Sequence, residues 1–225
     1  MKNVLNYIIS FFLLILIGAY CYKLSSFPLL DLLKKFPLYL WLGIISFIIV
    51  NRIPHPYIAV NLSRFKVSVH ESIHIMVALL FGKQVTESRT SHTSGGHMKY
   101  QGGITVPGVE MLISLAPYFL SYLAWALILL KDFTSSSIKN PLLFAIGFVW
   151  TFHLITFYEQ SVGYYFRSRK HQSDISGGKH YSTYTAYLFI LFMNIILNSL
   201  IVLNLTQPSL MDDFMKAPMY LRTLF

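Results

Sequence analysis

Residues 66–85 read KVSVHESIHIMVALLFGKQV and place two histidines and a glutamate inside a largely apolar run. His70, Glu71 and His74 follow the pattern H-E-x-x-H. On a helix, residues four apart lie on one face, so both imidazoles can reach one metal ion. With the 8 histidines and 4 glutamates of this chain, chance predicts only about 0.005 such matches. The stretch therefore predicts a metal-binding helix.

The composition places this helix in a membrane protein. Of the 225 residues, 55% are hydrophobic and 12% are charged, which is outside the range usual for soluble domains. The single cysteine, Cys21, excludes an internal disulfide and a cysteine-rich metal site, so a metal would be held by His, Asp or Glu. The 18 Lys and Arg are scattered between apolar runs, as membrane flanks are, and no nucleic-acid recognition motif surrounds them. No nucleic-acid partner is expected.

Six apolar runs are candidates for membrane helices, of which the second is short and the third is unusually polar. They cover residues 4–22, 36–50, 57–81, 109–130, 141–163 and 184–203. We take the third helix to begin near residue 57, because His70 and His74 then lie near its middle. We expect an all-α polytopic membrane protein with about six transmembrane helices.

The connection at residues 82–108 predicts a small β-hairpin between the third and fourth helices. Gly82 is placed to end the third helix in the left-handed conformation. Polar and larger residues then alternate on both sides of Ser94, Gly95 and Gly96, a pattern typical of two strands joined by a glycine turn. An extended peptide could pair with the edge of such a hairpin.

The pattern H-E-x-x-H supplies only two ligands, whereas a catalytic zinc ion usually has three from the protein. A metzincin-type continuation would need a glycine and a histidine where the chain has Val77 and Leu80, so that class is excluded. The remaining candidates for the third ligand are Glu110, Glu159, Asp174, His92, His97 and His153.

The order of these features resembles the site-2 protease class of intramembrane zinc metalloproteases. The H-E-x-x-H helix, Gly82, the glycine-containing hairpin and the following membrane helix carry the resemblance. SLAPYFLSYLAW, at residues 114–125, is similar to the small-residue and proline segment that follows the hairpin in such proteins. QSDISGG, at residues 172–178, stands where small bacterial relatives have an Asp ligand, although the Asn-Pro-Asp-Gly and Leu-Asp-Gly motifs of many site-2 proteases are missing.

The resemblance implies one Zn²⁺ per chain, held by His70, His74 and Asp174, with Glu71 as base and then proton donor. It also implies a membrane protein or peptide substrate and a multi-pass protein of the bacterial inner membrane. The chain would be a single integral membrane domain, residues 1–225. This domain would comprise two N-terminal helices (1–56), a metalloprotease-like core (57–203) and an interfacial tail (204–225).

Two further polar residues lie within predicted helices. His153 and Asn194 would either contact the oxyanion or substrate or bond a neighbouring helix. Two other functions fit the same His and Glu residues. One is a membrane transporter or channel that moves metal ions or protons, and the other is a non-catalytic relative that keeps the motif for structure.

Overall fold

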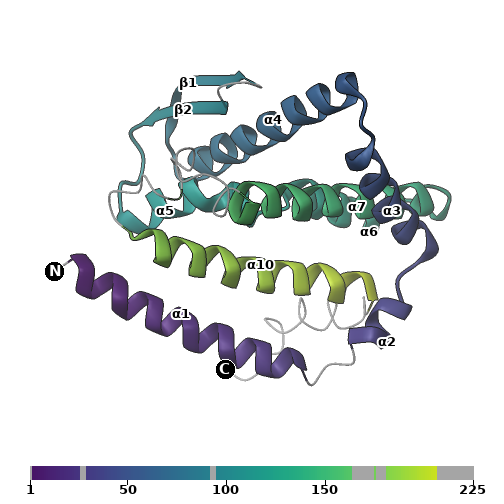
Figure 1. Cartoon of the computed structure of the whole chain (residues 1–225), viewed down its shortest axis with the longest axis horizontal. Helices are drawn as coiled ribbons and strands as arrows, with labels where there is room; N and C mark the ends of the chain where they lie inside the picture. Colours follow the sequence, from purple (N-terminus) through teal and green to yellow (C-terminus); the bar gives the residue numbers. More distant parts are fainter. Residues whose placement is uncertain (1, 26–28, 92–94, 164–174, 176–180, 207–225) are drawn as a thin grey trace.

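The computed structural model describes residues 2–25, 29–91, 95–163, 175 and 181–206. The described chain is mostly helical with one two-stranded sheet, which confirms the predicted fold class in outline (Figure 1). The elements in chain order are α1 (Lys2–Ser25), α2 (Leu29–Lys34), α3 (Leu38–Arg52), α4 (Pro56–Leu80), β1 (Gln84–Ser91), β2 (Gly95–Gln101), α5 (Pro107–Leu115), η1 (Ala116–Tyr118), α6 (Tyr122–Asp132), α7 (Ser136–Phe157), η2 (Tyr158–Gly163) and α10 (Thr183–Thr206).

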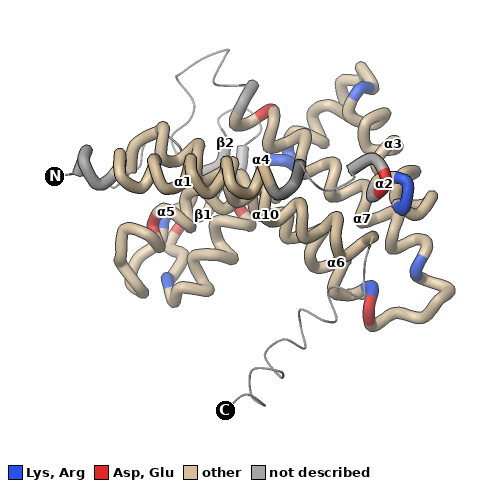
Figure 2. The backbone as a smooth tube through the Cα atoms, turned by 90° about the horizontal axis from the view of Figure 1, so that it is seen from below, with Lys and Arg blue, Asp and Glu red and all other residues tan. Residues whose placement is uncertain are grey.

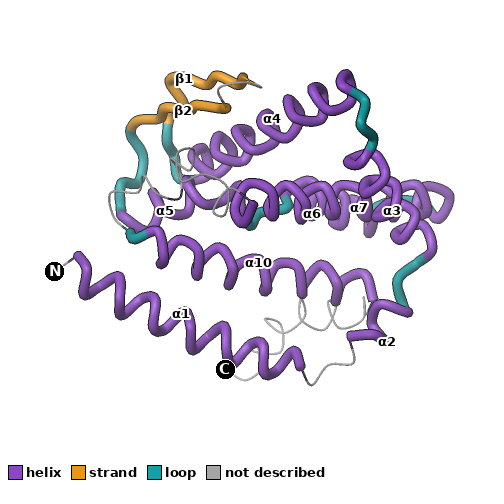
Figure 3. Tube along the Cα trace, viewed as in Figure 1, coloured by secondary structure: helices purple, strands orange, loops and turns teal. Residues whose placement is uncertain are grey.

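The helices form layers, which Figure 3 shows in the view of Figure 1. α1 and α10 lie side by side, joined by a hydrogen bond of 2.9 Å between Ser10 Oγ and Thr185 Oγ1. Above them α7 packs against α3 and α6, and α4 crosses over this layer with the hairpin at its end. α10 extends to Thr206, so the predicted tail 204–225 begins as helix, and from residue 207 it lies outside the described residues.

Two glycines bring α3 and α7 into backbone contact. A methyl group at Gly43 would overlap the Phe144 carbonyl oxygen, and one at Gly147 would overlap the Leu40 carbonyl oxygen. Small residues allow helix backbones to approach in this way in membranes, where apolar burial does not by itself drive helix association. The pair therefore fixes α7, the helix that leads to the site described below.

The prediction of six spans is not confirmed. Within the described residues, Ser136–Ser161 and Thr183–Thr206 are long and apolar enough to cross a bilayer, and the number rises to four if each of two bent helix pairs makes one span. The bent pairs are α3 with α4, at 116°, and α5 and η1 with α6, at 80°. The apolar part of α1, Asn6–Tyr22, is shorter than the roughly 20 residues that a span usually needs.

The distribution of charge explains the lower number. α10 carries no charged residue along its length, as Figure 2 shows. The N-terminal half of α4 is polar and includes Asn61, Arg64 and Lys66. α4 is therefore not apolar enough to count as a membrane span by itself. The predicted span 109–130 is interrupted by the 3₁₀ turn η1, which contains Pro117, a residue without the N–H that a continuous helix needs.

α4, at Pro56–Leu80, lies within one residue of the predicted third helix, 57–81, and confirms its start near residue 57. Its end is a Schellman motif: Lys83 N donates to Ala78 O at 3.0 Å and Gly82 N donates to Leu79 O at 2.9 Å. Gly82 has a φ of 69°, which confirms the predicted left-handed helix end. This turn directs the chain straight into β1.

β1 and β2 form the predicted antiparallel hairpin, with Gln84 opposite Gln101 and a bulge between Val85 and Glu87. Its turn, at residues 92–94, lies outside the described residues. Met98 and Tyr100 pack against the buried cluster that also contains residues of α4 and α5. The hairpin is thereby held against the C-terminal half of α4.

Candidate metal centre

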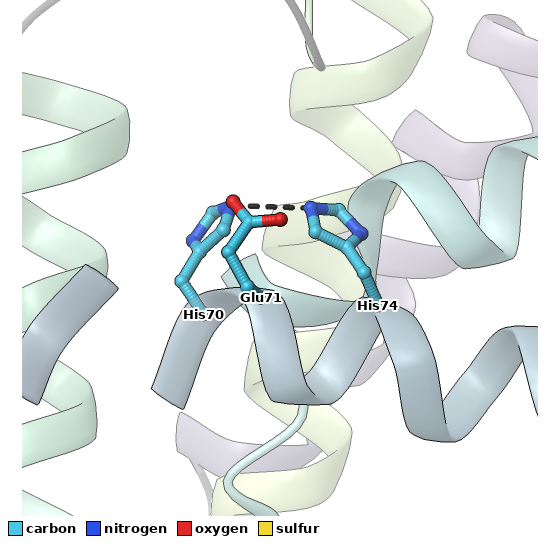
Figure 4. A group of neighbouring side chains, drawn as sticks. All are labelled: His70, Glu71 and His74. Atoms are coloured by element: carbon cyan, nitrogen blue, oxygen red, sulfur yellow. Dashed lines mark hydrogen bonds between the residues drawn. The ribbon is translucent and has the colours of Figure 1, made fainter. Parts of the chain in front are cut away.

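Three side chains from the middle of α4 form a buried group: His70, Glu71 and His74 are 9%, 6% and 6% exposed. One ligand atom from each lies within 4.8 Å of the others, and among the described residues this is the only such group of His, Cys, Asp or Glu. Figure 4 shows the two imidazoles and the carboxylate on the same side of the helix. The i, i+1, i+4 spacing thus gathers the three groups as predicted.

Each imidazole uses its Nδ1 atom for a contact outside α4. His74 Nδ1 lies 2.7 Å from the Ile113 carbonyl oxygen, and His70 Nδ1 lies 3.0 Å from Gln160 Oε1. A carbonyl oxygen can only accept, so His74 Nδ1 carries the proton, and His70 Nδ1 does the same in the orientation in which Gln160 presents Oε1. In the neutral ring the lone pair is then on Nε2. Both histidines therefore present Nε2 as an acceptor.

The two Nε2 atoms face each other at 3.2 Å, the contact drawn in Figure 4. Two lone pairs at this distance repel unless a proton or a metal ion lies between or beside them. Two nitrogen ligands 2.0–2.1 Å from one tetrahedral zinc ion are about 3.3 Å apart. The donor atoms and their spacing therefore fit zinc, with Glu71 beside the position of the ion.

The helix break at η1, between α5 and α6, contributes contacts next to the His-Glu group. η1 places the Tyr118 ring edge-on to His70, with ring centroids 5.2 Å apart. Asn194 Nδ2 donates to the Tyr118 carbonyl oxygen at 2.8 Å, and so ties η1 to α10. Ser72 Oγ and Tyr122 OH, 3.1 Å apart, join α4 to the start of α6. The interruption at η1 therefore contributes contacts that a straight helix would not.

Asp174, the expected third ligand, lies outside the described residues, as do His92 and the side chain of His97. The next residue after Asp174 is described. Ile175 is 1% exposed and belongs to the same buried cluster as Ile73 and Val77 of α4. The chain at position 175 therefore lies in the core that surrounds the site.

The two alternative carboxylates have other partners. Glu110 Oε1 lies 2.7 Å from Lys83 Nζ, and Glu110 Oε2 accepts a hydrogen bond of 2.7 Å from Tyr100 OH. Glu159 Oε2 lies 2.6 Å from Lys66 Nζ. Neither carboxylate joins the group on α4. Their charge is balanced by lysines.

His153 and Asn194 lie beside each other in the interior, 7% and 6% exposed. Asn194 donates both Nδ2 hydrogens to backbone oxygens, those of Tyr118 and Ile190, at 2.8 and 2.9 Å. His153 Nε2 has no hydrogen-bond partner within the described part of the chain. Asn194 is thus a structural tie in this arrangement, and His153 retains a polar atom for a further contact.

Sequence reasoning missed the partners of the histidines. The Ile113 oxygen belongs to the backbone, so no residue type indicates it. Gln160 stands among polar residues at the end of a predicted helix, and only its position after Glu159 hints at a role. Its reach to His70 depends on η2, a π-helical turn, which has no simple sequence signal.

A membrane-type helical fold with a buried His-Glu-x-x-His group is the arrangement expected of a membrane metallopeptidase. A family model described as Peptidase M50B-like matches residues 41–158, just over half of the chain. The chain therefore belongs to this family, the site-2 protease family, which confirms the resemblance. Peptidases of the M50 group depend in general on zinc. No curated protein and no solved structure matches the chain.

Proposed function

We propose that this protein is an intramembrane zinc metalloprotease that hydrolyses peptide bonds of membrane-embedded protein or peptide substrates. The observation that carries the proposal is the pair of His70 and His74 Nε2 atoms, 3.2 Å apart, with both Nδ1 atoms engaged elsewhere. Glu71 supplies a carboxylate in the same buried group. Family membership supports the reading as a peptidase.

In this proposal His70, His74 and Asp174 hold one zinc ion per chain. The first two present neutral imidazole nitrogens, and a carboxylate is a common third ligand of catalytic zinc. Two observations support Asp174 as the third ligand. Its neighbour Ile175 is buried in the same cluster as Ile73 of α4, and the two alternative carboxylates, Glu110 and Glu159, are paired with lysines.

Zinc bound at this position would lower the pKa of a water molecule to about 7 and polarise the scissile carbonyl group. The Glu71 carboxylate then takes a proton from the attacking water and passes it to the amide nitrogen that leaves. His153 is the proposed donor to the oxyanion through Nε2, and Asn194 fixes the adjoining turn. The buried site keeps lipid away from the reacting groups.

The proposed substrates are helical membrane segments that unwind locally before cleavage. A two-stranded sheet leaves one outer edge on each strand, so an extended segment can add a strand to the hairpin formed by β1 and β2. We place the protein in the bacterial inner membrane, as an integral multi-pass protein. The apolar spans α7 and α10 support the membrane location.

The test compares the wild type with Glu71→Gln, in full-length protein reconstituted in liposomes with a membrane-embedded reporter peptide. Glu71→Gln removes the base and keeps the shape, so cleavage should fall by about 100-fold or more while zinc content stays the same. Asp31→Asn is the matched control, because Asp31 is exposed and pairs only locally with Lys34. Its cleavage rate should equal that of the wild type.

Each rival function gives a different result in the same liposomes. A transporter would move zinc or protons across the membrane and cut no peptide. A non-catalytic relative would behave identically with and without the Glu71→Gln substitution. Either outcome would exclude the protease.

A further inference from the structure

The π-helical turn η2 continues α7 and contacts α4 beside the metal centre. Glu159 Oε2 of this turn lies 2.6 Å from Lys66 Nζ, and the next residue, Gln160, directs Oε1 at His70 Nδ1 at 3.0 Å. Lys66 and His70 are four residues apart, so they lie on one face of α4. Two consecutive residues of η2 thus engage two consecutive turns of α4.

We infer that Gln160 is a positioning residue for His70, and that the ion pair of Lys66 and Glu159 holds η2 at the distance that this role requires. The inference rests on the proposed zinc site and adds a residue that the family model does not cover, because the match ends at residue 158. Gln160 itself contacts neither the metal position nor the substrate in this assignment. It acts through the His70 ring.

The role follows from the chemistry of imidazole. Gln160 Oε1 accepts the hydrogen of His70 Nδ1, which keeps the lone pair on Nε2 and fixes the rotation of the ring. Partners of this kind orient metal-ligating histidines and raise their basicity. His74 receives the same support from a backbone carbonyl, that of Ile113, which no side-chain substitution removes. The described acceptor of His70 Nδ1 is therefore a side chain that a substitution can replace.

The π turn is what places Gln160. A π-helical turn holds an extra residue compared with an α-helix, so it changes which side chains face a neighbouring helix. Three contacts hold the turn besides the ion pair. Asn51 Nδ2 of α3 donates to Glu159 Oε1 at 3.5 Å, Tyr187 OH of α10 donates to Ser161 O at 3.3 Å, and Ser161 Oγ donates to Phe157 O at 2.5 Å within the segment itself. α3, α4 and α10 all contribute to holding the segment from 157 to 161.

The experiment measures zinc affinity by competition with a fluorescent chelator, on full-length protein in detergent micelles. Gln160→Leu removes the acceptor and should weaken zinc binding 10- to 100-fold. Gln160→Glu keeps an acceptor at the same reach and should bind zinc at least as tightly as the wild type. Tyr158→Phe is the matched control, because it changes an exposed hydroxyl in the same turn and should leave the affinity unchanged.

A second measurement does not involve the metal. Nitrogen-15 NMR of the histidines in zinc-free protein should show the Nδ1–H form for His70 in the wild type and a loss of that preference in Gln160→Leu. If Gln160→Leu fails to fold, Gln160→Glu and Lys66→Met carry the test. Lys66→Met should weaken zinc binding by a smaller factor than Gln160→Leu would, since it loosens η2 without removing the acceptor.

The outcomes separate this inference from the proposed function. Equal zinc affinity in the wild type and Gln160→Leu, or equal loss in Gln160→Leu and Gln160→Glu, would overturn the positioning role and leave the protease untouched. Zinc binding by the wild type that depends on Gln160, without cleavage of any reporter, would overturn the protease and leave the positioning role in place.

Discussion

Lys83 is a buried lysine whose charge is balanced by one carboxylate, and this makes the attachment of the hairpin sensitive to mutation. Its side chain is 2% exposed and its Nζ atom lies 2.7 Å from Glu110 Oε1 and 5.0 Å from the centroid of the Tyr100 ring. Glu110 is 28% exposed and also accepts a hydrogen bond from Tyr100 OH. The three residues join the end of α4, the hairpin and α5.

The unequal burial of the two partners predicts unequal costs. Glu110→Ala leaves a buried ammonium group without its carboxylate, which should lower the free energy of unfolding by about 3–5 kcal/mol. Lys83→Met leaves a partly exposed carboxylate that keeps the Tyr100 hydroxyl, so the cost should be about 1–2 kcal/mol. The double variant, Lys83→Met with Glu110→Ala, has no buried ammonium group without a partner, so it should be more stable than Glu110→Ala alone.

The free energies can be measured by denaturant unfolding of full-length protein in micelles, followed by circular dichroism, and combined in a double-mutant cycle. The exposed pair of Asp31 and Lys34 is the matched control, and the same substitutions there should change little. Equal costs for the two single variants, or a double variant as unstable as the sum of both, would refute the reasoning.

Two further predictions concern the helix contact and the third ligand. Gly147→Leu should destabilise the protein by about 3 kcal/mol through overpacking against α3, whereas Gly18→Leu, with open space around it, should not; unfolding in micelles checks both. Asp174→Asn should lose zinc by metal analysis, whereas Glu159→Gln, which alters a carboxylate paired with Lys66, should retain most of it. If Glu159→Gln lost zinc and Asp174→Asn retained it, Glu159 and not Asp174 would be the third ligand.

Structural features that depend on residues close together in the sequence were predicted correctly. The start of α4 near residue 57, its end at Gly82 and the hairpin that follows were all anticipated, since H-E-x-x-H spacing, a left-handed glycine and strand alternation each depend on near neighbours. The grouping of His70, Glu71 and His74 was predictable for the same reason, because one helix supplies all three side chains.

Prediction failed where the relevant partner is distant in the sequence. Gln160 lies 90 residues beyond His70, and Lys83 meets Glu110 across the whole hairpin. Hydrogen bonds and ion pairs of this kind follow from packing, and residue type alone does not specify the partner. Glu159 illustrates the point, because its residue type made it a candidate third ligand, and within the described part of the chain it pairs with Lys66.

Two of the places where a predicted span was not confirmed also build the site. α4 is too polar for an ordinary span because it carries Lys66, His70 and Glu71, and the span after the hairpin is broken at η1, which brings the Tyr118 ring to His70. Polar groups and broken helices at membrane depth are tolerated where protein or a polar cavity surrounds them. Local rules for membrane helices are therefore violated here where function requires it, and an apolar, unbroken version of these two segments would restore the predicted spans while removing the ligands and their supports.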